Sequence, residues 1–239
     1  MSYILEIVKM NNLNYGIIGN CKTAALIDQN GSIDWCCLPD FDSSSIFAKI
    51  LDTKNGGFFS IKPVGKYKIK QHYLDKTNVL VTKFFRKEDS FQVYDFMPRY
   101  KTDSGSYHCP PDIIRYIRNI RGNPKFRVHY NPRPAYAQYD SKFEVSEEFI
   151  KAITTKGSYE SVYLYTDISF DKILESKPVK LEKECFFALS YNQKLFKPDI
   201  DWVRLEYQRT KVYWLGWLAK TKVFTKYQKE VERSSLVLK

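Results

Sequence analysis

Acidic and aromatic side chains gather in one polar stretch near the N-terminus, where Trp35, Asp40, Phe41 and Asp42 lie close together in the sequence. Cleavage of a glycosidic bond needs two carboxyl groups at a set separation, so this stretch is a candidate for that chemistry. However, Asp42 stands where it can cap a helix, and Asp34 stands where it can hold a hairpin through backbone hydrogen bonds. We therefore predict that none of these carboxylates is catalytic.

The other reactive side chains are scattered along the chain. Its three histidines, His72, His108 and His129, show no order with Ser and Asp that indicates a catalytic triad, and we predict structural roles for them. The cysteines are odd in number and irregularly spaced, which argues against a disulfide framework, and no Cys-x-x-Cys pair indicates zinc. We predict free thiols, no metal site and no cofactor. The cysteines are Cys21, Cys36, Cys37, Cys109 and Cys185.

A hairpin and a short helix are the elements predicted to position the polar stretch. Apolar runs at residues 23–27 and 33–38 flank Asn30-Gly31, a hairpin turn pattern in which both residues tolerate positive φ. Pro39 ends the second strand because it offers no N–H to a sheet. The apolar residues beyond the loop predict a helix that ends at Gly56-Gly57. Its predicted apolar face consists of Ile46, Phe47, Ile50 and Leu51.

The segment from residue 57 to about 200 is predicted to consist of strands. Runs of β-branched and aromatic residues recur at near-regular spacing, separated by Gly, Pro and polar turns. The run 113–121 fits both a helical face and a strand, and its β-branched residues and the following Gly122 favour a strand. This pattern predicts an all-β fold, an antiparallel β-sandwich. The predicted strands are residues 57–63, 67–73, 79–85, 91–96, 113–121, 126–130, 143–145, 149–153, 161–165 and 184–191.

The C-terminal part changes to a helical pattern. From Asp201, large and apolar residues recur at steps of three and four, which predicts a helix over 201–222, and a second helical segment occupies 227–239. Four apolar residues of these segments are predicted to be exposed and to form an interface with another domain. These are Trp214, Trp217, Leu236 and Leu238.

The composition limits the classes of protein to consider. The formal net charge of +11 is a reason to consider nucleic acid, but the basic residues are spread out and alternate with apolar ones, as on the solvated face of a sheet. No apolar run reaches the roughly 18 residues of a membrane span. The N-terminal apolar run is short and interrupted by Glu6, unlike a signal peptide. We therefore predict a cytoplasmic protein that contacts neither nucleic acid nor membrane.

Several ordered motifs resemble one known family. They read GSIDWCCLPDFDS at 31–43, VYDFMPRY at 93–100, YHCPPDIIRYIR at 107–118 and RVHYNPRPAY at 127–136. This pattern is similar to the N-terminal domain of glycoside hydrolase family 15, the glucoamylase, glucodextranase and trehalase group. The resemblance spans nearly the whole chain and implies a large antiparallel super-β-sandwich followed by a short helical linker.

The resemblance also implies how the chain is divided. Residues 1–200 would form the β-sandwich, 201–222 the linker helix, and 223–239 the start of the first helix of a catalytic (α/α)6 barrel. Family members hydrolyse α-glucosidic bonds with inversion, and both catalytic groups are glutamates of the barrel, so they would lie beyond Lys239. The implied partner is this barrel, in the same chain or a separate one, through which the protein would meet an α-glucan or trehalose.

Three hypotheses for function remain at this stage. The first is a non-catalytic domain that supports the barrel, with Trp35, Asp40, Phe41 and Asp42 in a loop that either anchors the interface or lines the sugar entrance. Aromatic rings stack on sugar faces and carboxylates accept sugar hydroxyls, but aromatic interface anchors are the more common case. The second hypothesis is a stand-alone glucan-binding module that uses Trp35 and aromatic strand faces. The third is a basic nucleic-acid binder.

Overall fold

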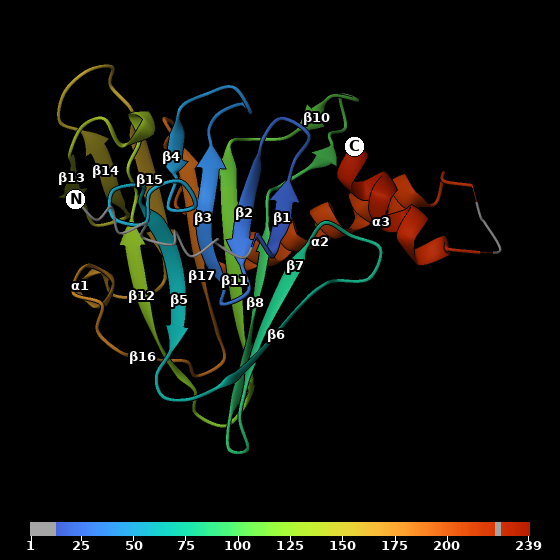
Figure 1. Ribbon diagram of the computed structural model, residues 1–239, viewed down its shortest axis with the longest axis horizontal. Coiled ribbons are helices and arrows are strands. Elements are labelled where there is room, and N and C mark those ends of the chain that lie inside the picture. The colour runs from blue at the N-terminus through green and yellow to red at the C-terminus, as the bar shows by residue number, and fades with distance from the viewer. Residues whose placement is uncertain (1–12, 223–225) are drawn as a thin grey trace, which may run out of the picture.

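Two antiparallel sheets pack face to face, and two helices follow them at the C-terminal end (Figure 1). The computed structural model describes residues 13–222 and 226–239. Apolar side chains from both sheets, such as Ile33 and Phe59 of one and Phe91 and Leu189 of the other, form a common core between them. The prediction of an all-β antiparallel sandwich with C-terminal helices is confirmed.

The first sheet has the order β1-β2-β3-β5-β12-β16, with β4 paired to β3. Its strands are β1 (Tyr15–Gly19), β2 (Ala24–Asp28), β3 (Ser32–Cys37), β4 (Ser45–Phe47), β5 (Phe58–Pro63), β12 (Lys125–Asn131) and β16 (Val179–Lys180). β12 shows why these sequences form strands. Phe126, Val128 and Tyr130 are buried in the core, while Lys125 and Arg127 alternate with them and face solvent.

The second sheet has the order β13-β14-β15-β17-β11-β8-β7-β6. Its strands are β6 (Lys68–Tyr73), β7 (Leu80–Phe85), β8 (Ser90–Phe96), β11 (Asp112–Arg121), β13 (Ser141–Val145), β14 (Ile150–Thr154), β15 (Ser161–Thr166) and β17 (Glu184–Tyr191). A separate small hairpin pairs β9 (Tyr100–Lys101) with β10 (Tyr107–His108). The segment 113–121 is therefore a strand, as its β-branched residues predicted.

The hairpin around Gly31 is confirmed, with a turn that differs from the predicted one. Gly31 adopts a φ of +81°, but Asn30 does not share the positive φ. Asp28 holds the turn instead, because its Oδ1 accepts hydrogen bonds from the amides of Asn30 at 2.9 Å and Ser32 at 2.7 Å. One glycine is thus enough to reverse the chain when an Asx side chain organises the turn.

The helix predicted over residues 46–51 is wrong. Ser45–Phe47 form strand β4, whose register with β3 places Phe47 opposite Cys36. The next residues form irregular turns, in which Ile50 donates its amide to the carbonyl of Asp34 at 3.2 Å and Leu51 is exposed. Apolar spacing fits a helical face here, but pairing with β3 and burial of Ile46 and Phe47 in the core outweigh it. Asp42 consequently has no helix to cap.

A buried arginine joins the two sheets. Arg115 on β11 lies opposite Asp95 on β8, and both side chains are fully buried. Arg115 Nε donates to Asp95 Oδ1 at 2.8 Å, and its other nitrogens donate to the carbonyls of Phe59 at 2.7 Å and Gly31 at 2.6 Å. Because Phe59 and Gly31 belong to the opposite sheet and its hairpin turn, one guanidinium fixes the two layers relative to each other.

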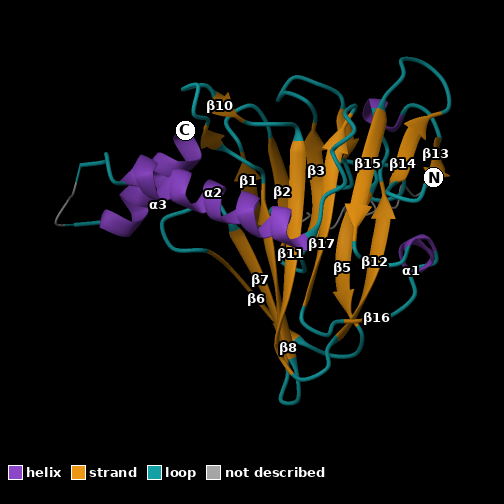
Figure 2. Ribbon diagram, turned by 180° about the vertical axis from the view of Figure 1, so that it is seen from behind, coloured by secondary structure: helices purple, strands orange, loops and turns teal. Residues whose placement is uncertain are grey.

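Helix α2 (Ile200–Leu218) covers the outer face of the second sheet and crosses β11 and β17 (Figure 2). Asp199 caps it by accepting from the Trp202 amide at 2.7 Å. Val203 is buried in a cluster with Phe96 and Tyr116, and Tyr207 packs against both rings. The predicted helical spacing from Asp201 is confirmed.

Helix α3 (Gln228–Leu238) packs against the end of α2 through Trp214, Leu218 and Leu236. Asn78 Nδ2 donates to the Leu236 carbonyl at 3.0 Å, which ties α3 to the second sheet. Trp214 and Leu236 are buried in this contact, so the prediction that they are exposed is wrong. Leu238 is 87% exposed, as predicted.

No helix within residues 13–222 and 226–239 is both long and apolar enough to cross a membrane. The N-terminal apolar run, with Glu6, lies outside the described residues.

Candidate functional site

The polar loop of residues 38–44 is fixed at its base by neighbouring segments. The Thr23 hydroxyl donates to the Cys37 carbonyl, and the Phe41 amide donates to the Lys22 carbonyl at 3.2 Å. At its other end, Ser44 Oγ donates to Glu160 Oε1 at 2.7 Å. These bonds hold the backbone of an exposed loop in one conformation, which suits a surface that must match a partner.

The predicted residues of this loop point to solvent. Phe41 is 64% exposed, and Asp40 and Asp42 are exposed beside it. The Asp40 amide donates to Ser43 Oγ at 3.1 Å, so a local turn presents the two carboxylates on the outside. The loop therefore offers one aromatic ring and two hydrogen-bond acceptors to whatever covers it.

Trp35 does not belong to this loop. It lies within β3 and is half-buried, opposite Leu26 of β2. The register shifts between Leu26 and Ile27, leaving Asp34 as an extra residue, and this β-bulge separates Trp35 from core-facing Ile33 and Cys36. Trp35 thus lies on the outer face of the first sheet, and its predicted role beside Asp40, Phe41 and Asp42 remains untested.

Asp34 holds the bulge through side chains rather than through the predicted backbone hydrogen bonds. Its carboxylate accepts from Ser32 Oγ at 2.6 Å, from Tyr15 Oη at 3.2 Å and from Lys49 Nζ at 3.1 Å. Burial and the adjacent Asp34 carboxylate raise the pKa of Tyr15 to about 12. A paired, buried carboxylate of this kind fixes the local structure of the strand.

Phe41 and three of the predicted interface residues meet in one place. A cleft of about 220 Å³, which we name the α3 cleft, is lined by Phe41, Trp214, Leu236 and Leu238 together with β1 and β2 residues. Among the residues that line it, neither Trp35 nor Trp217 occurs. The structure therefore brings the polar loop and the C-terminal helix to the same end of the sandwich.

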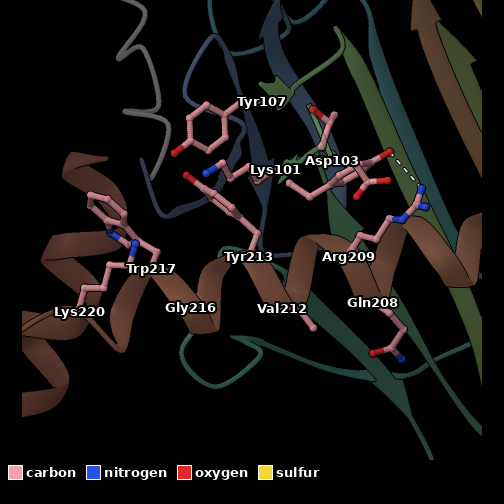
Figure 3. A pocket seen from close by; sticks show the side chains of 12 residues that line it. Lys101, Asp103, Tyr107, Gln208, Arg209, Val212, Tyr213, Gly216, Trp217 and Lys220 are labelled. Carbon is pink, nitrogen blue, oxygen red and sulfur yellow. Dashed lines mark hydrogen bonds between the residues drawn. The ribbon is translucent and has the colours of Figure 1, made fainter. Parts of the chain in front are cut away.

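A larger groove lies between the β9–β10 hairpin and α2, with a volume of about 820 Å³ (Figure 3). We name it the hairpin groove. Tyr107 and Lys101 of the hairpin face Tyr213 and Trp217 of α2 across it, and Lys220 just beyond the end of α2 completes that side. Aromatic faces next to ammonium donors suit a polar ligand with an apolar face or an interface with another protein.

Arg99 connects these surfaces and was not among the residues singled out from the sequence. It is buried between the rings of Tyr107 and Tyr213, at 4.8 and 5.1 Å from their centroids. Its Nη1 donates to the Asn20 carbonyl at 2.6 Å and its Nε to Tyr213 Oη at 2.8 Å. Asn20 Nδ2 in turn donates to the Pro110 carbonyl at 2.7 Å. Arg99 lies in the MPRY motif, which was the available signal.

The histidines and buried thiols do not form a reactive group in the described part of the chain. His108 stacks on Tyr100 at 4.7 Å, and His129 Nδ1 lies 3.3 Å from Ser176 Oγ. Burial raises the pKa of the Cys36 and Cys185 thiols well above the usual value, which keeps them unreactive. Residues 13–222 and 226–239 contain no cluster of three or more His, Cys, Asp or Glu that could hold a metal ion.

Comparison with known proteins identifies what the chain is similar to. A family model described as trehalase-like, N-terminal, matches residues 10–171. A trehalase of Thermoplasma volcanium is 29% identical over 233 residues, which cover 94% of this chain and 36% of the relative. A trehalase of Thermoplasma acidophilum is 27% identical, over 90% of this chain and 37% of the relative. Trehalase 1 of Sulfolobus acidocaldarius is 50% identical over 84 residues, 35% of this chain and 14% of the relative. The chain thus spans little more than a third of the length of the Thermoplasma relatives.

Proposed function

The chain belongs to the trehalase-like N-terminal family, and from this premise we propose that it is the non-catalytic N-terminal domain of an enzyme that hydrolyses α-glucosidic bonds. The relatives that match nearly all of this chain are named trehalases, and they are almost three times as long as the matched part. The observation that carries the proposal is this match of nearly the whole chain to little more than a third of proteins named trehalases. The enzyme would be of trehalase or glucoamylase type, within glycoside hydrolase family 15.

The domain would support a catalytic (α/α)6 barrel, supplied by the same chain or by a separate one. The barrel would carry the acid and base glutamates of an inverting reaction and bind trehalose or an α-glucan. In support, the rigid loop 38–44 and the exposed end of α3 present Phe41 and Leu238 at one end of the sandwich, where a second domain can cover them. Unpaired cysteines agree with a cytoplasmic location for such an enzyme.

Catalysis is tested by incubating this chain with trehalose or maltose and measuring released glucose. We expect no release from the chain alone, and turnover when a catalytic barrel domain of a trehalase-type enzyme is joined to it. Turnover by the chain alone would contradict the non-catalytic role. Retention of full stability and activity by the barrel in the absence of this domain would contradict the supporting role.

Two substitutions in the whole enzyme separate a sugar-lining loop from an interface anchor. If Phe41 lines the sugar entrance, Phe41→Ala raises KM and leaves the melting temperature nearly unchanged, since Phe41 is mostly exposed. If Phe41 is an anchor, the same change weakens interdomain association and spares KM. Trp35→Ala is the matched aromatic control on the outer face of β3. A loss of stability with unchanged KM in Trp35→Ala would exclude Trp35 from the sugar site.

A stand-alone glucan-binding module is the second candidate function, and the hairpin groove favours it. Tyr107, Tyr213 and Trp217 line a groove of about 820 Å³ with ring faces that suit sugar stacking. Retardation of the chain in a native gel that contains soluble glucan tests this function. Unchanged mobility, relative to a gel without glucan, would reject it.

A further inference from the structure

Most of the excess positive charge of the chain gathers at one end of the sandwich. Four segments that each link one strand to the next lie there, namely residues 62–68, 86–89, 118–127 and 180–184. Together they hold eleven Lys and Arg residues and four Asp and Glu residues, a net charge of +7 out of the +11 of the whole chain. We name this surface the basic end.

The register of the strands brings the four segments together. In the first sheet Lys125 of β12 lies opposite Lys180 of β16, and in the second sheet Arg121 of β11 lies opposite Ser90 of β8. Figure 1 shows β16 and the turn between β7 and β8 at the lower end of the sandwich, with β4 and β10 at the upper end. The polar loop of residues 38–44, which joins β3 to β4, therefore lies at the opposite end from the basic end.

The cations of the basic end are exposed, and few of them are neutralised. All eleven are exposed to solvent. Arg86 pairs with Asp89 and Glu88, and Lys180 lies 3.8 Å from Glu182. The other nine form no ion pair with a carboxylate of the described residues, so their charge is available to an anionic partner. These nine are Lys62, Lys66, Lys68, Lys87, Arg118, Arg121, Lys125, Arg127 and Lys183.

Like charges also face each other across neighbouring strands. Lys62 of β5 lies opposite Arg127 of β12, and Lys125 lies opposite Lys180. Like charges in directly opposed positions destabilise a sheet. Burial lowers the pKa of His129 on β12, and Lys62 and Arg127 lower it further, which shows that their positive field reaches the neighbouring side chain. A bound anion would relieve this repulsion.

The side chains of the basic end limit what the partner can be. Within the described part of the chain, the one strongly exposed large apolar side chain at this end is Ile120, at 46%. The core of a protein–protein interface is depleted in charged residues and rich in aromatic ones, and a membrane anchor needs apolar side chains that insert. A single-strand binder needs exposed rings on which bases stack. The phosphate backbone of a duplex needs none of these and carries one negative charge per about 1.7 Å of its axis.

We propose that the basic end binds the phosphate backbone of double-stranded nucleic acid without sequence preference. Contacts to phosphate hold a protein on a duplex but carry no sequence information. The cations are spread along the sequence, which is why the sequence favours no contact with nucleic acid, and strand pairing brings them together in space. The proposed role in a hydrolase concerns the opposite end of the sandwich and is independent of this binding.

Fluorescence anisotropy of this chain with a labelled DNA duplex of about 20 base pairs tests the proposal. If about five of the nine unpaired cations meet phosphates, the logarithm of the binding constant should fall with the logarithm of the salt concentration with a slope of about −4.5. We expect a Kd in the micromolar range at about 50 mM salt and an affinity roughly 500-fold lower at about 200 mM. A second duplex of unrelated sequence should bind within about twofold of the first.

The double variant Lys62→Gln/Arg127→Gln removes one pair of opposed cations. It should weaken binding about tenfold and make the salt slope shallower by about 2, because each lost phosphate contact releases about one counterion fewer. Its urea midpoint should not fall, since the two side chains repel each other, so weaker binding cannot result from unfolding. Lys22→Gln/Lys156→Gln is the matched control, because it removes the same charge from exposed lysines at the opposite end. The control should bind within about twofold of the parent.

Absence of duplex binding by the parent at about 50 mM salt, or equal weakening by the variant and its control, would overturn the proposal. Tighter binding of a single strand than of the duplex would assign the basic end to base stacking. Sedimentation with phosphatidylserine vesicles in the absence of duplex binding would assign it to a membrane surface. Each of these results refutes the proposal and leaves the proposed role in a hydrolase unaffected.

Discussion

Replacing Arg115 by Met tests whether its buried guanidinium, which pairs with Asp95 in one sheet and donates to carbonyls of the other, holds the two sheets together. Met is similar in length and apolar, so it fills much of the volume of the Arg side chain in the core. The substitution leaves the Asp95 carboxyl group without its charged partner and removes the donors from the carbonyls of Gly31 and Phe59. No other side chain of the described residues hydrogen-bonds to the Asp95 carboxylate.

The expected cost is large because both partners of the pair are fully buried. Removal of one partner from a buried ion pair costs roughly 3–5 kcal/mol, and each unpaired carbonyl adds about 1 kcal/mol. These contributions overlap, so we expect the free energy of unfolding to fall by about 5 kcal/mol. This is a large part of the roughly 5–15 kcal/mol that stabilises a typical protein.

Urea unfolding followed by circular dichroism measures the effect, with Arg86→Met as the control. Arg86 also makes a bidentate pair, with Asp89, but it is partly exposed in the turn between β7 and β8, so its loss should shift the midpoint far less. The double variant Arg115→Met/Asp95→Leu removes the stranded carboxyl group and should return to within about 2 kcal/mol of the parent.

The pH dependence gives a second, independent readout. Burial raises the pKa of Asp95 even though the Arg115 guanidinium acts to lower it, so the pKa of Asp95 should rise further in Arg115→Met. A raised pKa in the folded state means that stability is lost as pH rises, so the deficit of Arg115→Met should be smaller at pH 5 than at pH 8. A loss of less than about 1 kcal/mol in the free energy of unfolding of Arg115→Met would refute the structural role of the pair. A double variant no more stable than Arg115→Met would refute it as well.

Three further predictions concern other parts of the molecule. Burial raises the pKa of Asp112 in the folded protein to about 7, above its unfolded value, so the parent loses about 4 kcal/mol of stability between pH 4 and pH 8. Asp112→Asn should remove this loss and unfold at a higher urea concentration than the parent at pH 8. An equal dependence of stability on pH in the two proteins would contradict this prediction. Gly57→Ala should cost about 2 kcal/mol or more in urea unfolding, because φ is +73° and the added Cβ would lie 2.5 Å from the Asn131 carbonyl oxygen. Trp214→Ala should speed hydrogen exchange of the α3 amides and leave exchange in the sheets unchanged, because Trp214 packs against Leu236 of α3. Val212→Ala, on the exposed side of α2, should leave exchange in α3 unchanged. Equal exchange in the two variants would show that Trp214 does not hold α3.

Local patterns in the sequence were sufficient for the type of most elements. The strand β12 could be predicted from the alternation of Phe126, Val128 and Tyr130, and α2 from steps of three and four between Val203 and Trp214. The hairpin at Gly31 was equally clear. These features depend on backbone geometry and on the direction in which consecutive side chains point, and neighbouring residues fix both.

The candidate sites were much less accessible from the sequence. Exposure of Asp40, Phe41 and Asp42 followed from a polar loop closed by Pro39. The face of the sheet on which Trp35 lies did not follow, because the bulge at Asp34 arises from pairing with β2. The Ser45–Phe47 segment became a strand because β3 lies beside it. The local sequence pattern does not show that β2 pairs beside Asp34 or that β3 pairs beside Ser45–Phe47.

The sequence alone determined an antiparallel β-sandwich with two C-terminal helices, because side-chain periodicity and turn residues act within a few positions. Only the tertiary structure decided which distant polar groups meet. Tyr100 and Glu206 beside α2, Asn20 and Arg99 beneath the loops, and Asp95 and Arg115 in the core are all brought together by the packing of sheets and helix. Burial raises the energy of an unpaired polar group, so its partner is selected in space and leaves no regular spacing in the chain.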